Sequence, residues 1–200
     1  MKILIVGATG LIGGAVANAL SANHEIISAG YSDGDVKVDL GSKASINAMF
    51  TAIGKVDAVI STAGLAGFAP FNELDDAAYD LALSNKLMGQ VNLVRVGQDH
   101  VSDDGSFVLT AGILSRQPMP GSVVISMANG ALESFAKAAS LELDRGLRVN
   151  TVSPVFVKET MVKMGMDPRS GLSAADTAKA YVAAVTGNMN GETLDAPDFA

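Results

Sequence analysis

The chain has 200 residues, of which 48% are hydrophobic and 18% charged, which is enough to bury the core of one domain and excludes a mainly disordered state. Its net charge of −7 disfavours non-specific binding to nucleic acid. It has no cysteine and only two histidines, which excludes disulfides, thiolate metal sites and a cysteine nucleophile, and we expect no bound metal.

The sequence begins with a short apolar run. Residues 3–6 are Ile-Leu-Ile-Val, and this run is too short for a signal-peptide core or a membrane span. We therefore expect a cytoplasmic protein that needs neither a membrane nor a nucleic acid as a partner.

Apolar segments of strand length alternate with longer helical segments along the chain. The expected strands cover residues 2–6, 25–29, 36–39, 56–61, 106–110, 148–152 and 192–195. The expected helices cover residues 11–22, 42–52, 75–83, 86–101, 122–145 and 173–186. Strands that are apolar almost throughout indicate burial on both faces, hence a parallel sheet between helices. The alternation predicts a single α/β domain over residues 1–200, doubly wound as in a Rossmann fold, with about seven parallel strands.

Three positions suggest where helices begin and end. Ser42 is an expected N-cap, and Ser173 with Asp176 forms the pattern of a capping box. Gly146 stands where a glycine commonly ends a helix, which predicts that the helix from residue 122 runs to residue 145.

A glycine-rich turn joins the first expected strand to the first expected helix. Gly7, Gly10 and Gly13 recur at every third position there. A tight turn and the close approach of a diphosphate to backbone N–H groups both favour residues without a Cβ, and a helix N-terminus attracts phosphate. The spacing predicts a dinucleotide-binding turn. The alternative is a turn that needs glycine only for packing.

The end of the second expected strand bears on which dinucleotide binds. An acid at this point favours NAD and an arginine favours NADP. Residues 28–33, Ser-Ala-Gly-Tyr-Ser-Asp, place neither at the strand end. Tyr31 and Ser32 suit a place beside the ribose, and the Ser32 hydroxyl suits a 2′-phosphate, so NADP is slightly favoured over NAD. The alternative is that Tyr31 is an exposed loop residue.

Further motifs follow the glycine turn in a fixed order. They are Asp39-Leu40, Ser61-Thr62-Ala63-Gly64, Asn85, Ala131–Phe135, and Arg148–Pro154 with Thr160. Together with Ile5–Gly13 they resemble the motifs of the short-chain dehydrogenase/reductase family almost end to end. The resemblance implies NAD(P) binding and oxidoreductase activity on a carbonyl or an alcohol. It implies cofactor contacts from Gly7, Thr9, Gly10, Leu11, Ile12, Gly13, Tyr31, Ser32, Asp39, Leu40, Ala63, Gly64, Asn129, Pro154, Val157 and Thr160.

The catalytic centre departs from the family's pattern, which is a Tyr-x-x-x-Lys pair with an upstream Ser. The flanking motifs put Ile125 at the Tyr position, Asn129 at the Lys position and Gly112 at the Ser position. Ile125 cannot transfer a proton, Asn129 carries no charge and Gly112 has no hydroxyl, so the standard mechanism cannot operate. Asn85 retains the asparagine that supports the family's proton relay.

Four hydroxyls lie close to these positions in the sequence and are candidates to replace the missing catalytic groups. Their alternative role is hydrogen bonding in loops and helix caps. They belong to Thr110, Ser115, Ser122 and Ser126.

Two functions follow from this reading. The first is an NAD(P)-dependent oxidoreductase that works on a small molecule without the standard Ser, Tyr and Lys. The alternative is a non-catalytic dinucleotide sensor or partner-binding protein. The family resemblance and the alanine-rich helix near residues 131–140 also predict a homo-oligomer, either a dimer or a tetramer.

Overall fold

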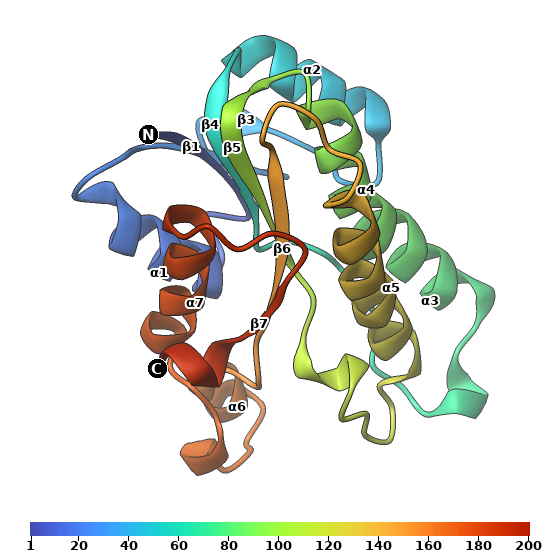
Figure 1. The fold of residues 1–200 in the computed structure, drawn as a ribbon. Coiled ribbons are helices and arrows are strands. Elements are labelled where there is room, and N and C mark those ends of the chain that lie inside the picture. The colour runs from blue at the N-terminus through green and yellow to red at the C-terminus, as the bar shows by residue number, and fades with distance from the viewer.

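The backbone is built around one parallel sheet. The computed structural model describes all residues 1–200. Seven strands pair in the order β3-β2-β1-β4-β5-β6-β7, all parallel (Figure 1). The strands are β1 Lys2–Val6, β2 Glu25–Gly30, β3 Val36–Lys37, β4 Val56–Ser61, β5 Val101–Thr110, β6 Arg148–Ser153 and β7 Thr193–Asp195. The helices are α1 Leu11–Ser21, α2 Lys43–Ile53, α3 Asp76–Leu81, α4 Met88–Gly97, α5 Val123–Ala139, α6 Lys158–Lys163 and α7 Ala174–Thr186. This architecture confirms the predicted doubly wound fold.

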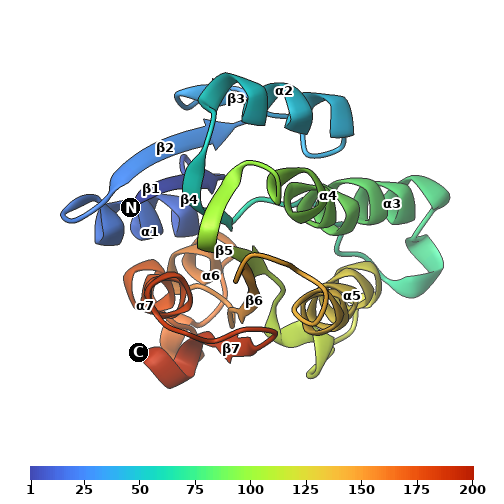
Figure 2. The same cartoon turned by 45° about the horizontal axis from the view of Figure 1, so that its top comes forward.

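Helices cover both faces of the sheet, as Figure 2 shows. Side chains alternate along β1: Ile3 and Ile5 pack against α1 and α7, whereas Leu4 and Val6 face the core under α2, α4 and α5. All four side chains are buried. The two buried clusters explain why the strands are apolar at every position, since a strand with both faces covered has no exposed side.

Element ends differ from the sequence prediction in several places. Only Val36–Lys37 of the expected strand 36–39 pairs with β2, and α4 ends at Gly97 so that β5 begins at residue 101. The predicted caps are present: the Ser42 hydroxyl accepts from the N–H of Ser45, and the Ser173 hydroxyl accepts from the N–H of Asp176.

The helix predicted to reach residue 145 is shorter. It ends at Ala139, and Gly146 is no helix terminus. Arg145 and Gly146 have φ values of +59° and +70° in the turn that enters β6. A Cβ on Gly146 would lie 2.2 Å from Asp104 Oδ1, and the Arg145 guanidinium donates to Val101 O. The glycine therefore serves a turn packed against the start of β5.

The two helices predicted at 75–83 and 86–101 are one continuous helical segment. A π-helical turn, Ala82–Leu87, joins α3 to α4. Such a turn inserts one extra residue into a helix and shifts the buried face on one side of it. The shift breaks the apolar period in the sequence, which is why the segment reads as two helices.

A buried hydroxyl network crosses the sheet. Thr110, at the end of β5, places its hydroxyl 2.5 Å from Ser61 O and 2.7 Å from the Tyr181 hydroxyl. Thr110 has a single hydroxyl proton, which it donates to Ser61, so Tyr181 donates to Thr110. Tyr181 is fully buried, and its ring fills the core between α7 and the sheet.

Tyr181→Phe removes that donor and keeps the ring. We expect a loss of about 1 kcal/mol in the free energy of unfolding, since Thr110 Oγ1 keeps its bond to Ser61 but loses its second partner. Urea unfolding of the wild type and the variant measures this loss in the free energy of unfolding. Tyr31→Phe is the matched control, because Tyr31 is 79% exposed and has no such bond, and it should leave stability unchanged. Equal stabilities for the wild type and Tyr181→Phe would contradict the role of the network.

Candidate functional site

Two cavities open at the C-terminal ends of the central strands. The larger, of about 550 Å³, lies over the ends of β1, β2 and β4. The smaller, of about 200 Å³, lies over the ends of β5 and β6. The glycine turn separates them, because Gly10 lines the larger cavity and Ile12 lines the smaller. In open parallel sheets, ligands bind at this edge, where the strand order reverses.

The glycine turn is packed too closely for side chains. Gly7 has a φ of +90°, and a Cβ there would lie 2.8 Å from Thr62 Oγ1. A Cβ on Gly13 would lie 2.0 Å from Gly7 O. Gly10 is the N-cap of α1 and no side chain caps this helix end. The backbone therefore forms a cradle at an uncapped helix N-terminus, which suits a phosphate group.

The larger cavity contains half of the predicted cofactor residues. Its lining residues are Val6, Gly7, Thr9, Gly10, Tyr31, Val38, Asp39, Leu40, Thr62, Ala63, Gly64, Leu65 and Asn85. Tyr31 is 79% exposed at its rim, and the Asn85 amide oxygen accepts from the N–H of Leu65 at 2.8 Å. Ser32 does not line the cavity, and its hydroxyl donates to Asp33 at 3.0 Å.

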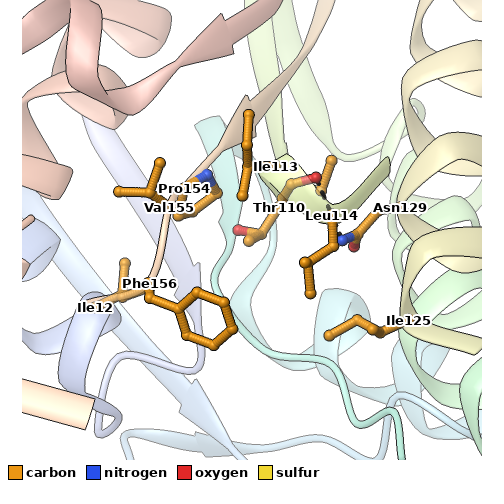
Figure 3. Close-up of a pocket in the computed structure, with 11 residues that line it drawn as sticks. Ile12, Thr110, Ile113, Leu114, Ile125, Asn129, Pro154, Val155 and Phe156 are labelled. Atoms are coloured by element: carbon orange, nitrogen blue, oxygen red, sulfur yellow. Dashed lines mark hydrogen bonds between the residues drawn. The ribbon is translucent and has the colours of Figure 1, made fainter. Parts of the chain in front are cut away.

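The smaller cavity brings together the three positions where the family's pattern fails, of which Ile125 and Asn129 are labelled in Figure 3. Its lining residues are Ile12, Thr110, Ala111, Gly112, Ile113, Leu114, Ile125, Asn129, Pro154, Val155 and Phe156. Apart from Asn129 and Thr110, no side chain among them carries a polar group. The cavity has no titratable side chain in its lining.

Asn129 is the notable polar group of this cavity. Its amide nitrogen donates to Gly112 O at 3.4 Å, while its amide oxygen is buried and has no hydrogen-bond partner. A buried acceptor without a partner is unfavourable and is usually satisfied by a ligand or water. Gly112 has a φ of +153°, and a Cβ on it would lie 2.9 Å from the Asn129 amide nitrogen. A side chain at position 112 would therefore require a shift of Asn129.

Four other predicted residues lie outside both cavities. Leu11 is exposed on α1, and Thr160 is half-buried in α6. Val157 is buried and forms an isolated bridge with Leu172. Gly13 lines neither cavity, and it packs directly against the backbone of Gly7 in the glycine turn.

The nearby hydroxyls have structural partners. Ser126 donates to Ser122, which in turn donates to Met119 O, and Ser115 contacts the Glu133 carboxylate at 2.6 Å. Arg116 lies between Glu133 on α5 and Asp195 on β7, and it holds the wall of the smaller cavity to the edge of the sheet.

Sequence reasoning missed Lys86, which is 6% exposed in the π-helical turn. Its ammonium donates to Thr110 O at 3.3 Å, and burial lowers the pKa of Lys86 to about 8. The available signal was spacing, because Ala82, Lys86 and Gln90 follow at intervals of four and all three are buried.

The structure assembles no group of three or more metal-binding His, Asp or Glu side chains. None of its helices combines the length and the apolar character needed to cross a bilayer.

Comparisons with solved structures show close likeness over the whole chain. The protein lin1944 of Listeria innocua is 42% identical, with a TM-score of 0.95 over 98% of both chains. A small-chain dehydrogenase crystallised with NADPH is 26% identical, with a TM-score of 0.86 over 98% of this chain and 95% of that one.

Sequence comparisons agree. Hydroxynaphthalene reductase arp2 of Aspergillus fumigatus is 26% identical over 135 residues, which cover 64% of this chain. The match spans only half of that reductase's length. The family described as enoyl-(acyl carrier protein) reductase matches residues 10–188. With the parallel sheet, the glycine cradle and this match over most of its length, the chain belongs to the short-chain dehydrogenase/reductase family.

Proposed function

We propose that this protein binds a nicotinamide dinucleotide, with NADP(H) slightly preferred to NAD(H), across the two cavities. The observation that carries the proposal is the cradle of Gly7 and Gly13 at the uncapped N-terminus of α1. With the diphosphate on this turn, the adenosine half lies over β1 and β2 and the nicotinamide half over β4, β5 and β6. The NADPH in a 26% identical family member supports the choice of ligand.

The side chains present fit such a ligand. Tyr31 and Asp39 line the adenosine end, where Asp39 already orders its loop by accepting from the N–H of Gly41 at 2.9 Å. At the other end, the unpartnered Asn129 amide oxygen is an acceptor for a ribose hydroxyl. Asn129 thus retains a binding role that a lysine has in the family, without the charge.

The reaction we propose is oxidoreductase chemistry on a small carbonyl or alcohol. The dinucleotide supplies or accepts the hydride, and this chain supplies an apolar cavity of about 200 Å³ that limits the substrate's size. Because Gly112, Ile125 and Asn129 replace the Ser, Tyr and Lys, no lining side chain donates the proton. A positioned acid contributes about 10²- to 10⁴-fold in rate, so we expect slow turnover.

One observation favours a second function. A cavity without any titratable lining residue suits a non-catalytic sensor, in which the bound dinucleotide changes the protein's surface. Tight dinucleotide binding with no turnover on any small carbonyl or alcohol would support the sensor over the enzyme.

We also propose that the protein is a homo-oligomer. Val123 and Met127 are exposed apolar side chains one turn apart on α5, which supports association through that helix. Light scattering should give a multiple of 20.4 kDa. A mass of one chain at micromolar concentration would contradict it.

The matched pair Gly13→Ala and Gly14→Ala tests the cradle. The Cβ of Gly13→Ala would lie 2.0 Å from Gly7 O, whereas that of Gly14→Ala would lie 3.5 Å from Ala8 O, an ordinary contact. We expect calorimetric titration with NADPH, NADP⁺, NADH and NAD⁺ to show at least a tenfold weaker affinity for Gly13→Ala.

Gly14→Ala should bind as the wild type does and be more stable by up to about 1 kcal/mol, from helix propensity. Thermal unfolding checks that both variants fold. Unchanged affinity in a folded Gly13→Ala variant would show that the phosphates do not lie on this turn.

The double variant Ile125→Tyr with Asn129→Lys tests the catalytic argument. It adds the phenol and the ammonium but leaves Gly112, whose φ of +153° disfavours a side chain. We expect carbonyl reduction to rise by about 10²-fold or more over the wild type.

The control Ile125→Phe with Asn129→Lys adds the ring without its hydroxyl and should show no such gain. If the wild type already turns over as fast as the Tyr and Lys variant, then another residue of this chain carries the proton.

A further inference from the structure

Lys86 lies inside the protein between the two cavities. A Cβ on Gly64, which lines the larger cavity, would be 3.1 Å from Lys86 Cγ. The ammonium donates to the carbonyl of Thr110, which lines the smaller cavity, at 3.3 Å. The side chain therefore runs behind the wall that the two cavities share.

Lys86 belongs to the π-helical turn. The residue before it, Asn85, contacts Leu65 at the larger cavity, whereas Lys86 is buried in the interior. Turns of this kind occur frequently at functional sites in helices. No ion pair holds the charge at this position.

No acid compensates the ammonium. Burial is the only cause that lowers the pKa of Lys86, and the neutral Gln90 amide shares its acceptor, Thr110 O, at 3.0 Å. Burying a cation without a carboxylate is unfavourable for folding. A buried ammonium without a carboxylate partner does not stabilise the fold, so its effect is expected at the site.

Few other ionisable groups face this region. Tyr31 and Asp39 line the outer part of the larger cavity, and Glu133 on α5 is paired with Arg116. Tyr181 reaches Thr110 from the far face of the sheet, and burial raises the pKa of its phenol, so it stays neutral. The two cavities together are called the groove below, and Lys86 is the buried positive charge beside it.

We propose that the Lys86 ammonium makes the groove select the reduced dinucleotide over the oxidised one. The inference rests on the proposed function, which places the nicotinamide half over the ends of β4, β5 and β6, in front of Lys86. The oxidised nicotinamide ring carries a positive charge and the reduced ring is neutral. Two unit charges about 10 Å apart in a medium of effective dielectric constant about 20 repel enough to change affinity roughly tenfold.

Titrations with NADPH and NADP⁺ measure this selection directly, because the two ligands differ only in the nicotinamide ring. At about pH 7 we expect the wild type to bind NADPH roughly tenfold more tightly. Lys86→Met, which keeps an unbranched chain without the charge, should bring the ratio close to one by tightening NADP⁺. Lys55→Met is the control: Lys55 is exposed before β4, at the opposite end of the strand, and its loss should leave the ratio unchanged.

The pH dependence gives a test that needs no variant. Burial lowers the pKa of Lys86 to about 8, so raising the pH from about 7 to about 9.5 removes the charge. The wild-type ratio should then fall toward one, while the ratio for Lys86→Met stays flat. Without ligand, the wild type should gain stability relative to Lys86→Met between about pH 8 and about pH 10.5, where only the unfolded lysine still holds its proton.

The outcomes separate the two proposals. If none of NADPH, NADP⁺, NADH and NAD⁺ binds, the proposed function fails. If NADPH and NADP⁺ both bind with a ratio that neither Lys86→Met nor pH changes, the proposed function stands and the role of Lys86 is overturned. Should Lys86→Met fail to fold, the wild-type pH series alone decides.

Discussion

The rest of the site depends on the close approach between the first turn and the first helix. Gly13 passes so near to Gly7 that a methyl group would collide with the backbone oxygen of Gly7. The same turn is tied to two neighbouring strands, because the N–H of Gly7 donates to Ala29 O at the end of β2 and Thr62 after β4 donates to Val6 O. Helix α1, β2 and the loop after β4 therefore meet around one backbone segment, and the cavities on either side take their positions from it.

The smaller cavity has the shape of a substrate site but a changed chemistry. Where the family places a proton donor and a cation, this chain presents an isoleucine and an amide, and the amide keeps an acceptor free. Gly112 and Asn129 fit each other so closely that they form a matched pair rather than two separate losses. A buried positive charge, that of Lys86, lies behind Thr110 of this cavity and comes from a different helical segment.

Most of the fold can be predicted from the sequence because the two patterns that indicate it are local. Apolar runs predict the strands, and the glycine spacing predicts the turn. The sequence also brings Gly112, Ile125 and Asn129 into register, and the structure places all three in one cavity. Prediction from the sequence fails where contacts between residues far apart in the chain determine the structure. The end of α5 at Ala139 depends on the turn against β5, and the π-helical turn that joins α3 to α4 disrupts the helical period. The free amide oxygen of Asn129 depends on which partners the fold brings near it, which no local pattern records.

The π-helical turn has a consequence for how this family member can change. Because each residue of an α-helix turns the chain by about 100°, removing one residue between Ala82 and Leu87 would restore an α-helix and rotate everything before the deletion against everything after it. Residues on the two sides of the deletion could then no longer keep their present directions together. A deletion of one codon, with no amino-acid substitution, is thus enough to turn α3, which has no buried residue, relative to the buried helix α4.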